Sequence, residues 1–125
     1  MQTNVLLSIK PEFAEKIFQG VKRYEFRKAL FKNREVEKII VYASAPVSKV
    51  IGEFEIEGIL NLEKELLWEF TKKYSGIPKD YFDDYFQGRE FGYAIKIKKS
   101  KLYESPLDLK HHYKINYPPQ SFMYL

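Results

Sequence analysis

The expected fold is decided by residues 8–28, which read SIKPEFAEKIFQGVKRYEFRK. Pro11 suits the first turn of a helix, where its missing N–H costs nothing, and the apolar residues that follow recur at helical spacing. Gly20 is typical of a helix end. Aromatic and charged residues then alternate from Lys22 to Arg27, as in a half-buried strand. The stretch therefore predicts a short helix, a glycine stop and a strand that carries charged side chains.

The charged residues of this strand allow two interpretations. Lys22 and Glu25 have opposite parity, so they would point to opposite faces of a regular strand. They converge only if Lys22 precedes the strand or a bulge intervenes, and Gly20 permits such a bent entry. By simple parity, Arg23, Glu25 and Arg27 share one face, where they would form a surface salt-bridge ladder worth under ~1 kcal/mol per pair. The alternatives are a shared pocket and an ordinary charged face.

The composition is that of a folded protein, and its length fits a single domain over residues 1–125. Hydrophobic residues make up 45% of the chain and aromatic residues 17%, which excludes a disordered chain and predicts an aromatic-rich core. The absence of cysteine excludes disulfides, thiol nucleophiles and thiolate zinc sites, and it suits a reducing cytoplasm. The formal net charge of +4 mildly favours an anionic partner.

The sequence contains no recognisable membrane segment. Residues 1–8 lack the basic start and the long apolar run of a signal peptide. The uncharged run over 39–48 is well short of the ~20 residues that a spanning helix needs. We therefore expect a cytoplasmic protein without a membrane partner.

The rest of the chain predicts short strands with helices inserted between them. Strands are expected where β-branched and aromatic residues cluster or alternate, and helices where apolar residues recur every three or four positions. Asn61 is expected to cap a helix, and Ser100 to lie in a turn between lysines. Besides the stretch described above, the expected strands cover 1–7, 39–43, 50–60, 91–97 and 122–125, the expected helices cover 61–74 and 79–86, and an exposed connection covers 29–37.

These elements add up to an α+β fold with about five or six strands and two or three helices. Because the strands do not alternate regularly with helices, a doubly wound parallel sheet is disfavoured. A small barrel with flanking helices fits the pattern.

Four residues of the opening stretch resemble the signature of a known family. Gly20, Lys22, Glu25 and Arg27 form a Gly-x-Lys-x-x-Glu-x-Arg pattern directly after a helix led by Lys-Pro, as in ASCH domains, which are small β-barrels of the PUA-like class. Three later segments, residues 42–46, 67–68 and 118–122, resemble the small bacterial and phage members. The resemblance covers nearly the whole chain, and it implies a small PUA-like β-barrel.

The resemblance also implies where a ligand would bind. It places a cleft between the barrel and the helix that begins at Pro11, with Lys22, Glu25 and Arg27 meeting the ligand. Residues 42–46 would form one wall, where Ser44 offers a hydroxyl and backbone groups.

One related bacterial branch hydrolyses acetylated cytidine, and its pattern differs from this chain. That branch uses a lysine, a threonine at the position of Glu25 and a glutamate from a later segment. Glu69 is a conceivable counterpart of the later carboxylate. In this interpretation Lys22 is the base, and Glu25 shuttles the proton or positions the water.

Three functions remain open from the sequence. The leading one is an RNA- or modified-nucleotide-binding domain, in which basic residues grip phosphate and a pocket near Tyr42 and Ser44 accepts an unstacked base. The basic residues expected to do so are Lys10, Lys22, Arg23 and Arg27. The second is a small hydrolase acting on a nucleoside amide or on RNA, and the third is a protein-interaction or regulatory domain.

The sequence predicts neither a cofactor nor a metal site. The only two histidines, His111 and His112, are adjacent and would need further ligands from elsewhere to hold a metal. The oligomeric state is left open.

Overall fold

A computed structural model describes residues 3–125. Met1 and Gln2, which begin the predicted N-terminal strand, lie outside the described residues. The described chain contains six strands, four α-helices and one short 3-10 helix. In chain order they are β1 (Asn4–Ile9), α1 (Pro11–Phe18), β2 (Tyr24–Arg27), β3 (Lys38–Ala43), β4 (Lys49–Glu63), α2 (Lys64–Thr71), the 3-10 helix η1 (Lys72–Tyr74), α3 (Lys79–Tyr85), β5 (Phe91–Leu107), α4 (Leu109–Tyr113) and β6 (Phe122–Tyr124).

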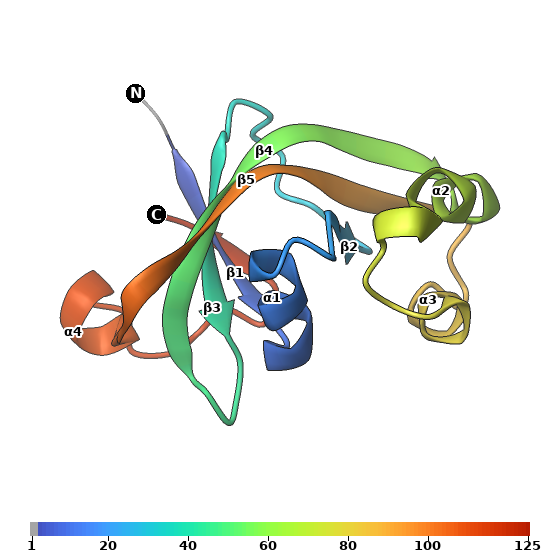
Figure 1. The fold of residues 1–125 in the computed structure, drawn as a ribbon. Coiled ribbons are helices and arrows are strands. Elements are labelled where there is room, and N and C mark those ends of the chain that lie inside the picture. Colours follow the sequence, from blue (N-terminus) through green and yellow to red (C-terminus); the bar gives the residue numbers. More distant parts are fainter. Residues whose placement is uncertain (1–2) are drawn as a thin grey trace.

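The six strands form one sheet that curls into an open half-barrel (Figure 1). The strand order is β2-β5-β4-β3-β1-β6. β1 and β3 run parallel, and every other neighbouring pair is antiparallel. The predicted α+β class and small barrel architecture are confirmed in this open form. The described chain has four α-helices, including the short α4, where the sequence predicts two or three.

The parallel strands β1 and β3 are both interior strands of the sheet, and they are apolar on both faces because both faces are covered. Val5, Leu6 and Leu7 of β1 are at most 1% exposed. Val5 and Leu7 pack with Ile17 of α1 in one core, whereas Leu6 packs with Leu109 of α4 in another. A continuous apolar run of this kind is what burial on both faces requires.

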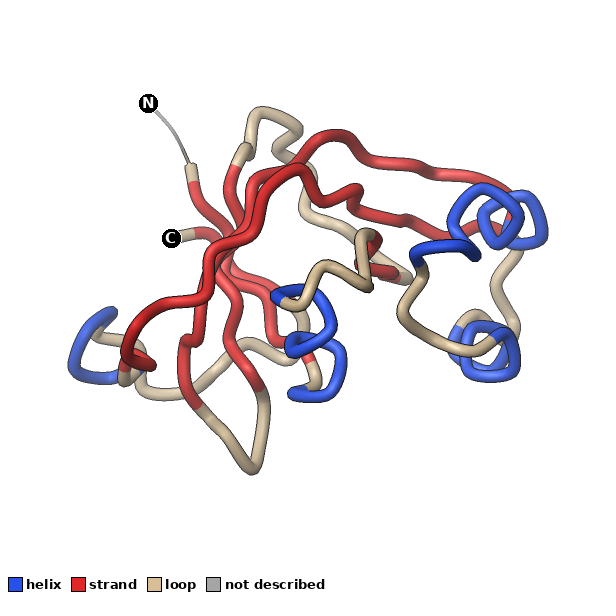
Figure 2. The backbone as a smooth tube through the Cα atoms, viewed as in Figure 1, coloured by secondary structure: helices blue, strands red, loops and turns tan. Residues whose placement is uncertain are grey.

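The helices α2 and α3 lie at the far end of the long β4–β5 ribbon (Figure 2), and a third core packs there. Phe82 and Phe86 of α3 are almost fully buried, and their rings contact Phe26 of β2 edge-on at centroid distances of 5.2 and 6.2 Å. Such edge-to-face contacts stabilise a core beyond the area that they bury. The aromatic cluster therefore fixes α3 opposite β2.

Three predictions about local structure were wrong. Asn61 does not cap a helix, because it pairs with Tyr93 inside β4 and the helix begins only at Lys64. Ser100 is not in a turn, because β5 continues through it and pairs it with Phe54. The connection over 29–37 is not uniformly exposed, since Phe31 is fully buried in the core beside α1.

α1 lies between the half-barrel and the α2–α3 pair (Figure 1). It reaches α3 through Phe13, whose ring meets Tyr81 edge-on at 5.1 Å. This arrangement brings β1, β2, α1 and α3 together around one space. No helix among residues 3–125 is long and apolar enough to cross a membrane.

Candidate functional site

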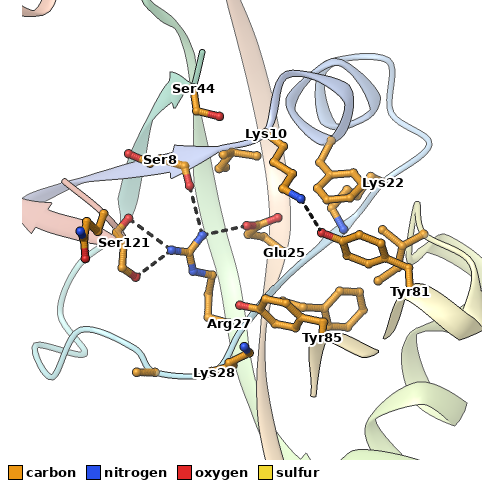
Figure 3. Close-up of a pocket in the computed structure, with 16 residues that line it drawn as sticks. Ser8, Lys10, Lys22, Glu25, Arg27, Lys28, Ser44, Tyr81, Tyr85 and Ser121 are labelled. Atoms are coloured by element: carbon orange, nitrogen blue, oxygen red, sulfur yellow. Dashed lines mark hydrogen bonds and ion pairs between the residues drawn. The ribbon is translucent and has the colours of Figure 1, made fainter. Parts of the chain in front are cut away.

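A cavity of about 440 Å³ lies where these four elements meet. Its volume falls in the range typical of small-molecule sites. Phe13, Phe26 and Ile77 contribute apolar wall, and most of the other lining residues carry polar groups. The polar lining residues are Ser8, Lys10, Lys22, Glu25, Arg27, Lys28, Ser44, Tyr81, Tyr85, Gln120 and Ser121 (Figure 3).

Lys22 enters the cavity because the chain bends between α1 and β2. Gly20 has a positive φ of 83°, and the backbone N–H of Lys22 donates to the carbonyl of Lys16 at 3.1 Å, so strand geometry has not yet begun. β2 starts at Tyr24. Lys22 therefore precedes the strand, and it shares the cavity with Glu25 despite their opposite parity.

The Lys22 side chain is buried, with 2% of the residue exposed. Its Nζ donates a 2.7 Å hydrogen bond to the carbonyl of Ser75. It also lies 4.8 Å from the ring centre of Phe26 and 5.5 Å from that of Phe13, which favours the charged form through cation–π attraction. The stem runs against Gly76, where a Cβ would come within 2.5 Å of the Lys22 Cβ.

Burial lowers the pKa of Lys22 from 10.5 to about 8, against an opposing effect of the Glu25 charge and with a smaller contribution from Lys16. The ammonium has three N–H donors, and the Ser75 carbonyl takes one of them. The other two have no hydrogen-bond acceptor among residues 3–125. Lys22 therefore brings unused donors to the cavity, and near neutral pH it can exchange a proton.

Glu25 and Arg27 form a buried ion pair beside Lys22. Arg27 Nη1 lies 3.1 Å from Glu25 Oε2, and the two side chains are 11% and 7% exposed. The guanidinium also donates to the carbonyl of Ser8 at 3.3 Å, and to the carbonyl and Oγ of Ser121 at 3.2 and 2.7 Å (Figure 3). Arg27 thus joins β1, β2 and the segment before β6, and most of its donors are already occupied.

Two tyrosines one turn apart on α3 form another wall of the cavity, and a lysine side chain contacts each of them. Lys10 Nζ donates to the Tyr81 hydroxyl at 3.2 Å and lies 5.4 Å from the ring centre. Lys28 Nζ lies 4.8 Å from the ring centre of Tyr85. Burial raises the pKa of Tyr85, so its hydroxyl stays protonated at neutral pH.

Five of the eight residues singled out in the sequence line this cavity, namely Lys10, Lys22, Glu25, Arg27 and Ser44. The other three do not. Arg23 is exposed and stacks on the Tyr74 ring at 4.3 Å. Tyr42 is buried in the core around Leu6, so residues 42–46 contribute only Ser44 to the wall. Glu69 is largely exposed and pairs with Lys72 at 2.7 Å.

The sequence reasoning missed the tyrosines of α3 and assigned them to the core with their phenylalanine neighbours. Phe82 and Phe86 are at most 1% exposed, whereas Tyr81 and Tyr85 are half-buried beside the cavity. The signal was present in the hydroxyl groups, because a tyrosine favours a position where one end is apolar and the other reaches polar groups. Ser8, Lys28 and Ser121 were also missed. Ser121 lies in the segment 118–122 that resembles the family, whereas no local pattern marks Ser8 or Lys28.

No group of three or more His, Cys, Asp or Glu side chains in residues 3–125 is placed to hold a metal ion. His111 and His112 are exposed on α4, where the His111 backbone N–H donates to Asp108.

Comparison with known proteins gives consistent matches. The family model described as the ASCH domain matches residues 7–102. A protein of Zymomonas mobilis named ASCH domain-containing ribonuclease is 30% identical over 122 residues, which cover 96% of this chain and 82% of that protein. The crystal structure of ASCH from Zymomonas mobilis superposes with a TM-score of 0.86 and 30% identity, covering 98% of this chain and 87% of that one.

Longer proteins also contain a related segment. The large ribosomal subunit protein uL22 of Ureaplasma parvum is 28% identical over 121 residues. That match covers 97% of this chain but only 39% of uL22. The chain therefore spans well under half the length of that relative.

Proposed function

This chain belongs to the ASCH domain family, and from that premise we propose that it binds single-stranded RNA and takes one unstacked nucleotide into the cavity beside Lys22. An RNA ligand is supported by the similarity to a Zymomonas protein named a ribonuclease, which this chain matches over most of its length. The net charge of +4 points the same way.

The observation that carries the proposal is the buried ammonium of Lys22 with two unused donors. A buried cation without a full set of partners costs free energy, so an apolar side chain of similar size would be preferred if the position served packing alone. A group of this kind in a cavity is a candidate for ligand contact. It calls for a ligand rich in acceptor atoms, as a nucleotide is.

The walls of the cavity suit a base. Phe13, Tyr81 and Tyr85 offer aromatic surface, and stacking on such side chains is worth about 1–3 kcal/mol per base. The volume of about 440 Å³ accommodates a single nucleotide. Because a base in a duplex cannot leave its stack without cost, the arrangement favours a single strand.

Lys10 and Lys28 are suited to grip the phosphates on either side of the inserted nucleotide. Both are exposed, and both line the cavity. In Figure 3 Lys10 lies above Glu25 and Arg27, and Lys28 lies below them. In this proposal the base enters the cavity while the backbone crosses it from one lysine to the other.

Fluorescence anisotropy of a labelled short RNA at several salt concentrations tests the proposal. We expect single strands to bind more tightly than duplexes, and binding to weaken steeply with salt. Lys28→Ala should reduce the slope of the logarithm of affinity against the logarithm of salt concentration by about one, as for the loss of one phosphate contact. Lys32→Ala, in an exposed loop outside the cavity lining, should leave this slope unchanged. An absence of affinity for any RNA, or an affinity independent of salt, would contradict RNA binding at this site.

A second candidate is RNA cleavage, and the pKa of Lys22 near 8 favours it. Neutral Lys22 would accept the proton of a ribose 2′-hydroxyl, and the 2′-oxygen would form a bond to the adjacent phosphorus. The bond from phosphorus to the 5′-oxygen would break, and that oxygen would take a proton from water. The hydroxide left behind would then recover the proton from Lys22. The products would be a 2′,3′-cyclic phosphate and a free 5′-hydroxyl.

The pH dependence separates the two candidates. Cleavage by neutral Lys22 should accelerate with rising pH up to about 8, and it should vanish in Lys22→Met. Binding through the protonated amine should instead weaken above that pH. A cleavage rate that is unchanged in Lys22→Met would exclude this role for the lysine.

A further inference from the structure

The carboxylate of Glu25 has one oxygen that no protein group occupies. Oε2 accepts from Arg27 at 3.1 Å, and Oε1 has no hydrogen-bond donor among residues 3–125. In that part of the chain, no fully enclosed side-chain N or O atom lacks a partner. Oε1 therefore reaches open space, and the open space that Glu25 lines is the cavity.

The surroundings of this oxygen are otherwise closed. Glu25 is 5% exposed, and its ion pair with Arg27 fixes the plane of the carboxylate. In Figure 3 the second oxygen points away from Arg27, toward the side of the cavity that holds Lys10 and Lys22. A buried acceptor in a fixed direction discriminates between ligands more strongly than an exposed one, because a wrong ligand leaves it unpaired.

The open oxygen limits what can lie against it. An ionised carboxylate only accepts hydrogen bonds, so the ligand must present an N–H or O–H donor there. A phosphate group offers acceptors and negative charge, and Glu25 repels it. The cavity thus combines unused donors on Lys22 with an unused acceptor on Glu25, a pairing that matches the mixed edge of a base.

We propose that Glu25 selects the base, accepting nucleotides whose base carries an amino group and rejecting uracil. This inference rests on the proposed function. Adenine, cytosine and guanine each project an exocyclic amine whose N–H can reach Oε1. Uracil has a single ring N–H between two carbonyl oxygens, and these oxygens face the carboxylate unfavourably.

Binding of four single-stranded RNAs that differ in one base tests the selection. Each RNA carries one base between abasic ribose phosphates, so the backbone contacts stay equal while the base changes. We expect the adenine, cytosine and guanine strands to bind at least about tenfold more tightly than the uracil strand, as for a lost hydrogen bond to a charged group. A strand with pyrimidin-2-one, which is cytosine without its amine, should bind as weakly as the uracil strand.

The outcomes separate the inference from the proposed function. Equal affinities for the four strands would overturn selection by Glu25 and leave RNA binding intact. No affinity for any strand, together with none for ordinary single-stranded RNA, would overturn RNA binding itself.

Glu25→Gln provides a direct reversal. The amide oxygen can still accept from Arg27, while the NH₂ group takes the place of Oε1 and turns an acceptor into a donor. The variant should lose the preference for amino-bearing bases and gain affinity for uracil relative to them. Glu69→Gln removes the same charge from an exposed position outside the cavity, so it should keep the wild-type preference. An unchanged preference in a folded Glu25→Gln protein would overturn the inference. If this variant does not fold, the affinities of the wild-type protein for the single-base strands decide.

Discussion

Burial and charge oppose each other most directly at Lys22. The side chain is enclosed between Gly76 and the rings of Phe13 and Phe26, and one backbone carbonyl is its hydrogen-bond acceptor. Burial lowers its pKa from 10.5 to about 8. The folded state therefore holds this proton less tightly than the unfolded chain does, and the difference is measurable as stability.

The first prediction concerns the pH dependence of stability. Between pH 8 and 10.5 the unfolded chain carries more protons on Lys22 than the folded protein does, so the free energy of unfolding rises with pH in that range. Relative to Lys22→Met, the wild type should gain about 2 kcal/mol between pH 7.5 and 9.5. Urea denaturation of both proteins at the two pH values measures the gain. A constant difference would show that the pKa of Lys22 is not lowered.

The second prediction compares two glycines with similar backbone conformation. Gly76 and Gly88 have φ values of 70° and 80°, so alanine is strained at both. A Cβ at Gly76 would lie 2.5 Å from the Lys22 Cβ, whereas at Gly88 it would meet nothing within 4 Å. Gly76→Ala should therefore destabilise the protein by roughly 1–3 kcal/mol more than Gly88→Ala. Thermal unfolding of the two variants measures both losses of stability. Equal losses would mean that the Lys22 side chain moves away from the new Cβ without cost.

Arg27 connects elements that are far apart in the sequence. Its guanidinium contacts Ser8 of β1, Glu25 of β2 and Ser121 before β6. The carbonyl of Ser121 also accepts from the backbone N–H of Ser8 at 3.1 Å. The short strand β6 is thus held to β1 partly through a side chain, and this side chain also forms a wall of the cavity.

The third prediction follows from this link. Arg27→Lys keeps the charge but loses the planar fork that reaches several acceptors at once. We expect a loss of about 2 kcal/mol in stability. Relative to the wild type, amide exchange should accelerate more in β6 than in β4. Arg23→Lys, at an exposed residue that stacks on Tyr74, is the control and should change neither quantity appreciably. Unaltered exchange in β6 would mean that the strand pairing alone holds it.

Most elements could be predicted from the sequence because local patterns encode them. The helix after Pro11 and the strand over Lys38–Ala43 carry clear periodicity and punctuation. The ends of the long β4–β5 ribbon could not be predicted, because Asn61 and Ser100 are held in strand geometry by partners more than 30 residues away. Pairing at that separation overrode the local preference for a cap and a turn.

The candidate site was predictable only in part. The bend after Gly20 allowed Lys22 and Glu25 to be placed in one pocket, whereas the position of Tyr42 depended on which face of β3 is covered by α4. Tyr81 and Tyr85 enter the site because α3 folds back over β2 through the aromatic cluster around Phe82. The hydroxyl groups favour a half-buried position for the two tyrosines, but the contact that brings α3 over β2 is tertiary and no pattern within α3 encodes it.

In the whole molecule, α1 lies between the half-barrel and the α2–α3 pair (Figure 1). The cavity is lined by residues of β1, α1, β2 and α3. Separate cores stabilise these parts, so the space between them stays open while its walls are fixed. The charged groups of the cavity come from the opening stretch of the sequence. Its aromatic rings come equally from that stretch, through Phe13 and Phe26, and from α3, through Tyr81 and Tyr85. The combination of charged groups and aromatic rings suits a ligand with a charged backbone and a flat base.

The affinity of Lys22→Met for a short single-stranded RNA, measured beside that of Lys32→Met, tests the central claim most directly. Both variants lose one positive charge, but only Lys22 lies in the cavity. With both proteins folded by circular dichroism, Lys22→Met should bind about tenfold or more weakly than the wild type, and Lys32→Met should bind about as tightly as the wild type. Equal affinities of the two variants would contradict the claim that RNA enters this cavity.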